Sequence, residues 1–191
     1  MSQFQKIVFD VDNVLADSMS VFCQKASVLL GYKLEIQQIK HHKVVGSIPL
    51  APRVIFNLQS EVWAEWMTLP SFEPQLAQKM NRFRELGFEI CVATGTPHRN
   101  VEHVKKWLQR MEIPYRSFFH CPKAGAKSGI PCEALVDDSP DEIKHFIRKG
   151  KQGFLYLQPW NASTSIPKAI TVKNLDEILE YYEKHMRIWQ T

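Results

Sequence analysis

Two short apolar runs in this sequence each stop at a pair of carboxylates. One run ends at Asp10, with Asp12 two positions later, and the other ends at Asp137 and Asp138. In an extended chain the side chains of residues i and i+2 point to the same side, so Asp10 and Asp12 face one small volume at the end of a strand. Like charges placed together cost free energy unless a cation or a reaction uses them. The two strand ends therefore predict one site for a hard cation.

Strand and helix patterns alternate along the chain, which predicts a parallel sheet layered by helices. Apolar residues at helical spacing begin near Ser18, and Gly31 ends that helix. Expected strands cover residues 6–10, 88–93, 134–136 and 153–157, and further expected helices cover residues 73–86, 100–111, 140–149 and 174–186. The predicted fold class is α/β, a three-layer sandwich.

Residues 18–69 are too many for a simple connection inside such a fold. Long insertions in compact domains usually carry function or their own structure. Because open α/β sheets bind ligands at the carboxyl ends of their strands, an insertion after the first strand would sit over the carboxylates. We therefore expect a small helical cap over residues 18–69 and a core made of residues 1–17 and 70–191.

Four short motifs resemble those of the haloacid dehalogenase-like (HAD) phosphohydrolases. They occur in the family's order and span residues 6–141, most of the chain. The motifs are Asp10-Val11-Asp12 at a strand end, a hydrophobic strand that ends at Thr94 before Gly95, then Lys127, and finally Asp137-Asp138. The resemblance implies the HAD Rossmann-like fold, in which a helical cap often occupies the position of residues 18–69.

Within that superfamily, residues 10–17 look most like the 5'(3')-deoxyribonucleotidase branch. They read Asp-x-Asp-x-Val-Leu-Ala-Asp, and Lys127 stands at the spacing before Asp137 expected of that branch. Asn13 departs from the pattern, since the family usually carries Gly there. Asn tolerates positive φ better than most residues, so a tight turn can survive the change.

The resemblance implies a Mg²⁺-dependent phosphomonoester hydrolase that forms an aspartyl phosphate, and specifically a 5'-nucleotidase for nucleoside or deoxynucleoside monophosphates. In such a mechanism Asp10 is the nucleophile and Asp12 is the acid and base. Carboxylates are recognised nucleophiles for phosphoryl transfer. The presence of Asp12 also favours a phosphatase, because the dehalogenases and phosphonatases of the family lack this second Asp.

The same resemblance implies the ligands of the metal and the phosphate. Asp10 and Asp137 would coordinate Mg²⁺ through their carboxylates, and Asp12 through its backbone carbonyl. Asp138 would either bind the ion through a water molecule or accept a hydrogen bond from one of the groups that coordinate it. Mg²⁺ prefers oxygen ligands, which fits this set. The substrate phosphate would be held by the Thr94 hydroxyl, the Gly95 amide and the Lys127 ammonium.

Several of these residues also have plainer interpretations. The acidic pairs could cap helices, and Thr94 could belong only to a strand-to-helix turn. Lys123 competes with Lys127 for the third motif. Aromatic residues of the expected cap could stack on a nucleobase or form the core of the cap, and the core interpretation is preferred for most of them; they are Phe22, Phe56, Trp63 and Trp66. His41 and His42 could contact phosphate or lie in a solvated turn.

Two other functions stay open at this point. One is a HAD phosphatase that acts on a sugar phosphate or another small metabolite. The other is a non-catalytic module that binds a metal or a nucleotide, against which stands the presence of every residue that the chemistry needs, Asp12 included.

Composition sets the remaining limits. A chain of 191 residues with 45% apolar residues supports one domain with a small insertion, and a net charge of +4 does not identify a nucleic-acid binder. The partner expected is a small phosphorylated molecule, with no nucleic-acid polymer and no membrane; a homodimer is left open. The sequence shows no secretion signal and no close cysteine pair, so the cytoplasm is the expected compartment.

Overall fold

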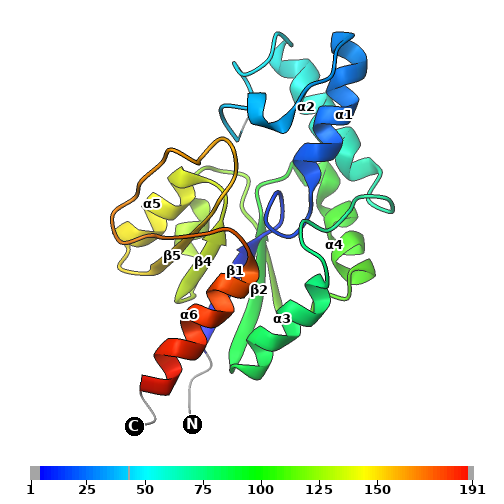
Figure 1. Ribbon diagram of the computed structural model, residues 1–191. Helices are drawn as coiled ribbons and strands as arrows, with labels where there is room; N and C mark the ends of the chain where they lie inside the picture. Colours follow the sequence, from blue (N-terminus) through cyan, green and yellow to red (C-terminus); the bar gives the residue numbers. More distant parts are fainter. Residues whose placement is uncertain (1–4, 43, 189–191) are drawn as a thin grey trace.

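The computed structural model describes residues 5–42 and 44–188 (Figure 1). Its centre is a six-stranded parallel sheet in the order β3-β2-β1-β4-β5-β6. The strands are β1 Gln5–Asp10, β2 Phe88–Thr94, β3 Ser117–His120, β4 Ala134–Asp137, β5 Gln152–Tyr156 and β6 Ile170–Val172. The α-helices are α1 Ser18–Leu30, α2 Pro52–Ala64, α3 Leu76–Glu85, α4 Val101–Arg110, α5 Pro140–Arg148 and α6 Leu175–Ile188. The predicted α/β fold with a parallel sheet is confirmed.

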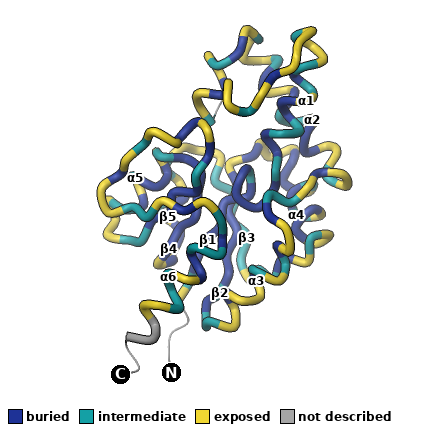
Figure 2. The backbone as a smooth tube through the Cα atoms, in the orientation of Figure 1, coloured by how far each residue is buried: buried dark blue, intermediate teal, exposed yellow. Residues whose placement is uncertain are grey.

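Helices cover both faces of the sheet. Apolar side chains of α3, α4 and α6 share one buried cluster with Ile7 and Phe9 of β1, whereas those of α5 share another with Val8. Alternate residues of β1 thus face opposite layers, as expected for a strand that is buried on both sides. Figure 2 shows the central strands as the most continuously buried part of the chain. These are the three layers that the sequence predicts.

The strand order reverses next to β1, which is where the acidic residues emerge. From β1 the chain moves through β2 to β3 on one side, and then through β4 and β5 to β6 on the other. Phe9 pairs with Val136 in the parallel register of β1 and β4. The following residues, Asp10 and Asp137, therefore lie side by side at the carboxyl edge of the sheet. In open α/β sheets this switch point is the usual ligand site.

A tight turn after β1 leads into the first helix. Asn13 has a φ of 60° there, the left-handed conformation expected for this residue in place of glycine. Its backbone N–H donates to the carbonyl of Ala16 at 2.8 Å. Its side-chain oxygen accepts from the backbone N–H of Met19 at 2.9 Å and from the Ser18 hydroxyl at 3.2 Å, so one residue both forms the turn and satisfies the start of α1.

The long segment after β1 is largely helical. It contains α1, the short 3₁₀ helix η1 Ile36–Gln38 and α2, and Gly31 ends α1 with a φ of 72°. In Figure 1, α1 and α2 lie beyond the carboxyl ends of the central strands. The division into a cap over residues 18–69 and a core stays a prediction, and residues 1–4, 43 and 189–191 of those ranges lie outside the described part.

Some elements differ from the sequence expectations. β3 and β6 were not predicted, because both are short and lack a continuous apolar run. The helix expected over residues 73–86 begins only at Leu76 and ends at Glu85, and the last helix extends to Ile188. None of the described helices is long and apolar enough to cross a membrane.

Gly153 tests the packing of α5 on the sheet. A Cβ on this β5 residue would lie 2.9 Å from Cγ2 of Ile143 and 3.2 Å from Cγ1 of Ile147, and Ile143 is fully buried. We expect Gly153→Ala to lower the free energy of unfolding by about 1–3 kcal/mol, because overpacking forces neighbouring side chains or the helix to move. Urea denaturation measures the change. Gly129→Ala is the control, since a Cβ there meets no atom within 4 Å; equal stability of both variants would contradict the packing argument.

Candidate active site

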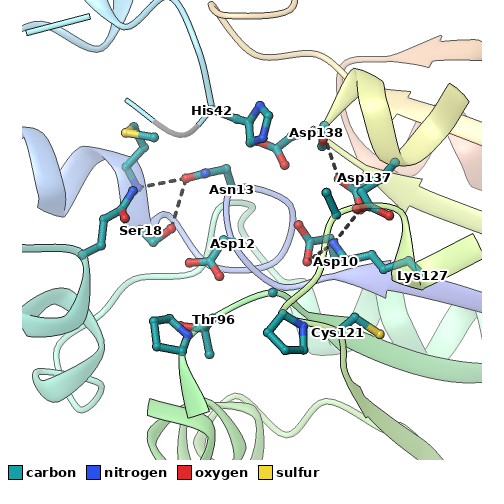
Figure 3. A pocket seen from close by; sticks show the side chains of 18 of the residues that line it. Asp10, Asp12, Asn13, Ser18, His42, Thr96, Cys121, Lys127, Asp137 and Asp138 are labelled. Carbon is teal, nitrogen blue, oxygen red and sulfur yellow. Dashed lines mark hydrogen bonds and ion pairs between the residues drawn. The ribbon is translucent and has the colours of Figure 1, made fainter. Parts of the chain in front are cut away.

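Three buried carboxylates meet where β1 and β4 end. Asp10 and Asp137 are the last residues of these strands, and Asp138 follows directly. One carboxylate oxygen of each residue lies within 4.8 Å of a carboxylate oxygen of the other two. Asp137 is fully buried, while Asp10 and Asp138 are 6% and 4% exposed. The structure therefore brings together three of the four predicted metal ligands (Figure 3).

Lys127 is the cation within this group. It lies on the 3₁₀ helix η3 Ala126–Gly129, and its Nζ is 2.7 Å from Oδ1 of Asp10 and 2.6 Å from Oδ2 of Asp137. Burial alone would lower the pKa of Lys127, but the attraction of Asp10 and Asp137 outweighs it and raises the pKa above its usual value. The ammonium therefore stays charged. Lys123 lines the same cavity, but its ammonium has no ion-pair partner within residues 5–42 and 44–188.

One ammonium does not balance the cluster. Burial raises the pKa of Asp10 well above its usual range; Lys127 lowers it, and the repulsion of Asp137 and Asp138 adds to the rise. Burial, together with the charge of Asp137, raises the pKa of Asp138 to about 8. When all three carboxylates are ionised, two negative charges remain beside Lys127. The all-oxygen donor set and this charge fit one Mg²⁺ ion.

Asp12 stands apart from the three-carboxylate group although it lines the same cavity. Its Oδ1 accepts a hydrogen bond from the indole Nε1–H of Trp63 at 2.9 Å. Burial raises the pKa of Asp12, while the neighbouring Ser18 hydroxyl and the N–H of Trp63 oppose the rise. A carboxyl group in this setting suits proton transfer better than metal binding by its side chain. Its backbone carbonyl stays a predicted metal ligand.

The end of β2 forms another wall of the site. Gly95 and Thr96 line the cavity, whereas Thr94 is fully buried behind them. The hydroxyl oxygen of Thr94 accepts from the backbone N–H of Thr96 at 3.1 Å. That bond leaves the hydroxyl proton of Thr94 able to donate. Its predicted contact with the substrate phosphate stays a prediction.

Comparison with known proteins assigns the architecture. Neither family models nor curated protein sequences give a match to this chain. Solved structures do match: CbbY from Rhodobacter sphaeroides in complex with phosphate has a TM-score of 0.61 at 15% identity, and covers 92% of this chain and 96% of its own. YfnB from Bacillus subtilis, described as a HAD hydrolase and bound to magnesium, has a TM-score of 0.63 at 13% identity, with 95% and 100% covered. This chain has the HAD hydrolase fold.

A third solved structure is also similar to this chain over nearly its full length. A protein from Lactobacillus plantarum described as a phosphoglycolate phosphatase has a TM-score of 0.64 at 11% identity, and the match covers 93% of this chain and 99% of that one. None of these three structures is described as a nucleotidase. The 5'(3')-deoxyribonucleotidase branch therefore stays a prediction from the motifs.

The segment that contains α1 and α2 supplies about a third of the residues that line the cavity, whose volume is about 290 Å³. This part of the lining is mainly apolar: Met19, Phe22, Phe56, Val62 and Trp63, with Ser18, His42 and Gln59 as its polar members. Phe22 and Trp63 are each 2% exposed and also belong to the main core cluster, so the core interpretation of these aromatics agrees with their burial. Phe56 is 50% exposed. His41 is exposed and is not among the residues that line this cavity.

Sequence reasoning missed the residues that hold the acidic side chains in place. The indole N–H of Trp160 donates to Oδ2 of Asp138 at 3.1 Å, and the backbone N–H of Ser139 donates to Oδ1 of Asp137 at 2.8 Å. Glu142 accepts from the backbone N–H of Gly125 at 2.6 Å, which ties the loop of Lys127 to α5. No motif marks Trp160 and Glu142, because their contacts with Asp138 and Gly125 join residues that are far apart in the sequence. The contact of Ser139 is local, two positions from Asp137.

The charge of the cluster gives a testable prediction. Above about pH 8, where Asp138 is ionised in the metal-free protein, Asp138→Asn keeps the shape of the side chain but removes one of three repelling charges, so the metal-free variant should have a higher Tm than the parent protein. It should also gain less Tm from excess Mg²⁺, because the ion loses a ligand or an acceptor of its bound water. Differential scanning calorimetry with and without Mg²⁺ measures both effects.

Asp141→Asn is the matched control for that experiment. Asp141 lies at the same cavity, but its side chain is 64% exposed and is not part of the buried group. Its substitution should leave the Mg²⁺-dependent rise in Tm unchanged. A metal-free Asp138→Asn protein that is less stable than the parent, and still gains the full Tm from Mg²⁺, would contradict the charge argument.

Proposed function

We propose that this chain is a Mg²⁺-dependent phosphomonoester hydrolase that forms an aspartyl phosphate on Asp10. The observation that carries the proposal is the separation of two kinds of carboxyl group in one cavity. Asp10 lies with Asp137, Asp138 and Lys127 in a group suited to a divalent cation, whereas Asp12 is held apart by a hydrogen bond from Trp63. A nucleophile near a cation and a distinct proton donor are what phosphoryl transfer needs.

In the first step a carboxylate oxygen of Asp10 attacks phosphorus. The bond between phosphorus and the leaving-group oxygen breaks, and its electron pair stays on that oxygen. Asp12 enters this step protonated, which its raised pKa favours, and gives its proton to the departing oxygen. The alcohol leaves, and the phosphoryl group stays covalently bound to Asp10.

In the second step water releases the phosphate. Asp12, now ionised, takes a proton from the water as its oxygen attacks phosphorus. The bond between phosphorus and Asp10 breaks, and the electron pair returns to the carboxylate. Both side chains are then in their starting states, so one residue serves as acid and as base within a turnover.

The remaining residues handle the negative charge. Lys127 would neutralise charge on Asp10 and on the phosphoryl oxygens, while the Gly95 amide and the Thr94 hydroxyl would donate to those oxygens. Asp10, Asp137 and Asp138, with the backbone carbonyl of Asp12, would hold Mg²⁺. When bound, Mg²⁺ supplies the positive charge that lets an anionic nucleophile approach an anionic phosphate.

For the substrate, a small phosphorylated metabolite is better supported than a nucleotide. The HAD structures similar to this chain include one described as a phosphoglycolate phosphatase and one in complex with phosphate. The 5'-nucleotidase remains the second candidate because Phe56, which is 50% exposed, lines the cavity and could stack on a base. A non-catalytic metal-binding module would not require Asp12 to be kept apart from the metal group.

Asp10→Asn tests the nucleophile. An amide cannot form the aspartyl phosphate, so release of inorganic phosphate from any ester should fall to the background rate while the fold is kept. Steady-state assays and the Tm of the variant measure the two effects. Asp141→Asn, with its exposed side chain at the cavity, is the charge-matched comparison. Turnover by Asp10→Asn at the parent rate would remove Asp10 from the mechanism.

A substrate panel with and without a chelator tests the reaction and ranks the substrates. Excess chelator should abolish activity, and excess Mg²⁺ should restore it, because both reacting groups are anionic without the cation. In the presence of Mg²⁺ we expect kcat/KM for phosphoglycolate or sugar phosphates to exceed that for nucleoside 5'- and 3'-monophosphates. A clear preference for nucleotides would instead select the nucleotidase branch, and full activity in chelator would contradict the metal assignment.

A further inference from the structure

Asp12 receives its hydrogen bond from outside the HAD core. The donor is the indole N–H of Trp63 on α2, which lies 51 positions along the chain and belongs to the segment inserted after β1. The indole N–H can donate but cannot accept, so the Asp12 atom that it contacts must serve as an acceptor. Trp63 itself is 2% exposed.

Trp63 is fixed from behind as well. Its ring packs edge-to-face on Trp107 of α4, with centroids 6.2 Å apart and an interplanar angle of 88°. Trp107 is fully buried and donates its own N–H to the carbonyl of Leu69 at 2.8 Å, the same carbonyl that accepts from Arg110. These contacts join the end of the inserted segment to α4. The indole therefore has little freedom to turn away from Asp12.

A second contact on the same face of α2 fixes the helix to the core. The hydroxyl of Ser60, one turn before Trp63, donates to Oδ1 of Asn100 at 3.0 Å. Residues three apart lie on one side of a helix, so Ser60 and Trp63 approach the core from the same stripe of α2. The contact of Ser60 with Asn100 and the packing of Trp63 on Trp107 together fix the position of the Trp63 N–H.

We infer that Trp63 is a positioning residue that orients the Asp12 carboxyl group for proton transfer to the leaving-group oxygen, an inference that rests on the proposed function. A carboxyl group transfers a proton well only when the oxygen that carries it points at the acceptor. The fixed N–H occupies Oδ1, so the proton is directed to Oδ2. Without the N–H, the carboxyl group is free to turn about its bond to Cβ.

A comparison of substrates with different leaving groups tests this role of Trp63. An alkyl phosphate needs its oxygen protonated as the bond breaks, whereas p-nitrophenyl phosphate releases a stable anion that leaves without a proton. Trp63→Phe keeps the ring and removes the N–H. We expect it to lower kcat/KM for the preferred alkyl phosphate by roughly ten-fold or more, and to change kcat/KM for p-nitrophenyl phosphate little.

Two further variants separate orientation from packing. In Trp63→His the Nε2 atom stands at the same place in the five-membered ring as Nε1 of tryptophan, so the donor returns although the ring is smaller. We expect its ratio of kcat/KM for the two esters to lie near that of the parent. Trp66→Phe makes the same change at a half-buried tryptophan of the same segment that does not contact Asp12, and it should leave the ratio unchanged.

A double-mutant cycle closes the test. In an Asp12→Asn background, Trp63→Phe should cause no further loss with the alkyl ester, because the group that it orients is gone. An equal loss with both esters, a full loss added on top of Asp12→Asn, or parent activity in Trp63→Phe would each overturn the inference. If Trp63→Phe does not fold, an ester ratio in Trp63→His equal to that in Asp12→Asn would overturn it. A parent protein without any phosphatase activity would instead refute the proposed function.

Discussion

The structure depends on keeping three almost fully buried carboxylates together in the lining of one cavity. Ionised carboxylates at this distance repel one another, and their burial adds a desolvation cost to the free energy of the folded state. Lys127 offsets part of it through ion pairs to Asp10 and Asp137, and N–H donors from Ser139 and Trp160 offset another part. The loop of Lys127 is in turn held by Glu142 through Gly125. Much of the polar architecture at this end of the sheet thus serves to hold negative charge that the fold itself does not need.

The parallel sheet is what makes that concentration of charge geometrically simple. Each strand runs in the same direction, so residues that follow adjacent strands emerge at one edge. The register places Phe9 beside Val136, and the next residue of each strand is an aspartate. Because Ile7, Val8 and Phe9 are buried among helices on both faces, the strands cannot slide without exposing apolar side chains. The apolar core therefore fixes the spacing of the acidic residues.

The fold and the acidic group could be predicted because their signals are local. Apolar runs that end in aspartate, and Gly31 after a helical pattern, mark element ends directly in the sequence. β3 and β6 escaped prediction because four and three residues are too few to establish a strand pattern in the sequence. Trp63 and Trp160 carry no local signal at all, because their partners Asp12 and Asp138 lie far along the chain and the contact exists only after folding. For Trp63, the sequence analysis weighed packing in the core against stacking on a base, but the structure shows a third arrangement. Its ring packs in the core, and its N–H reaches the site.

The bond between Trp63 and Asp12 has a consequence for how substrate choice and chemistry relate in this chain. Phe56, Gln59 and Val62 of α2 line the cavity, and Trp63 is the next residue of that helix. In the proposed mechanism the helix that contacts the leaving group therefore also orients the group that protonates it. A substitution that shifts α2 as a whole would move the donor to Asp12 together with the cavity wall, so the proposed mechanism couples substrate binding to proton transfer. Two HAD-fold chains with the same aspartates can then differ in rate toward one ester without any change in the residues that bond to phosphorus or the metal, because the inserted helix supplies the geometry of the acid.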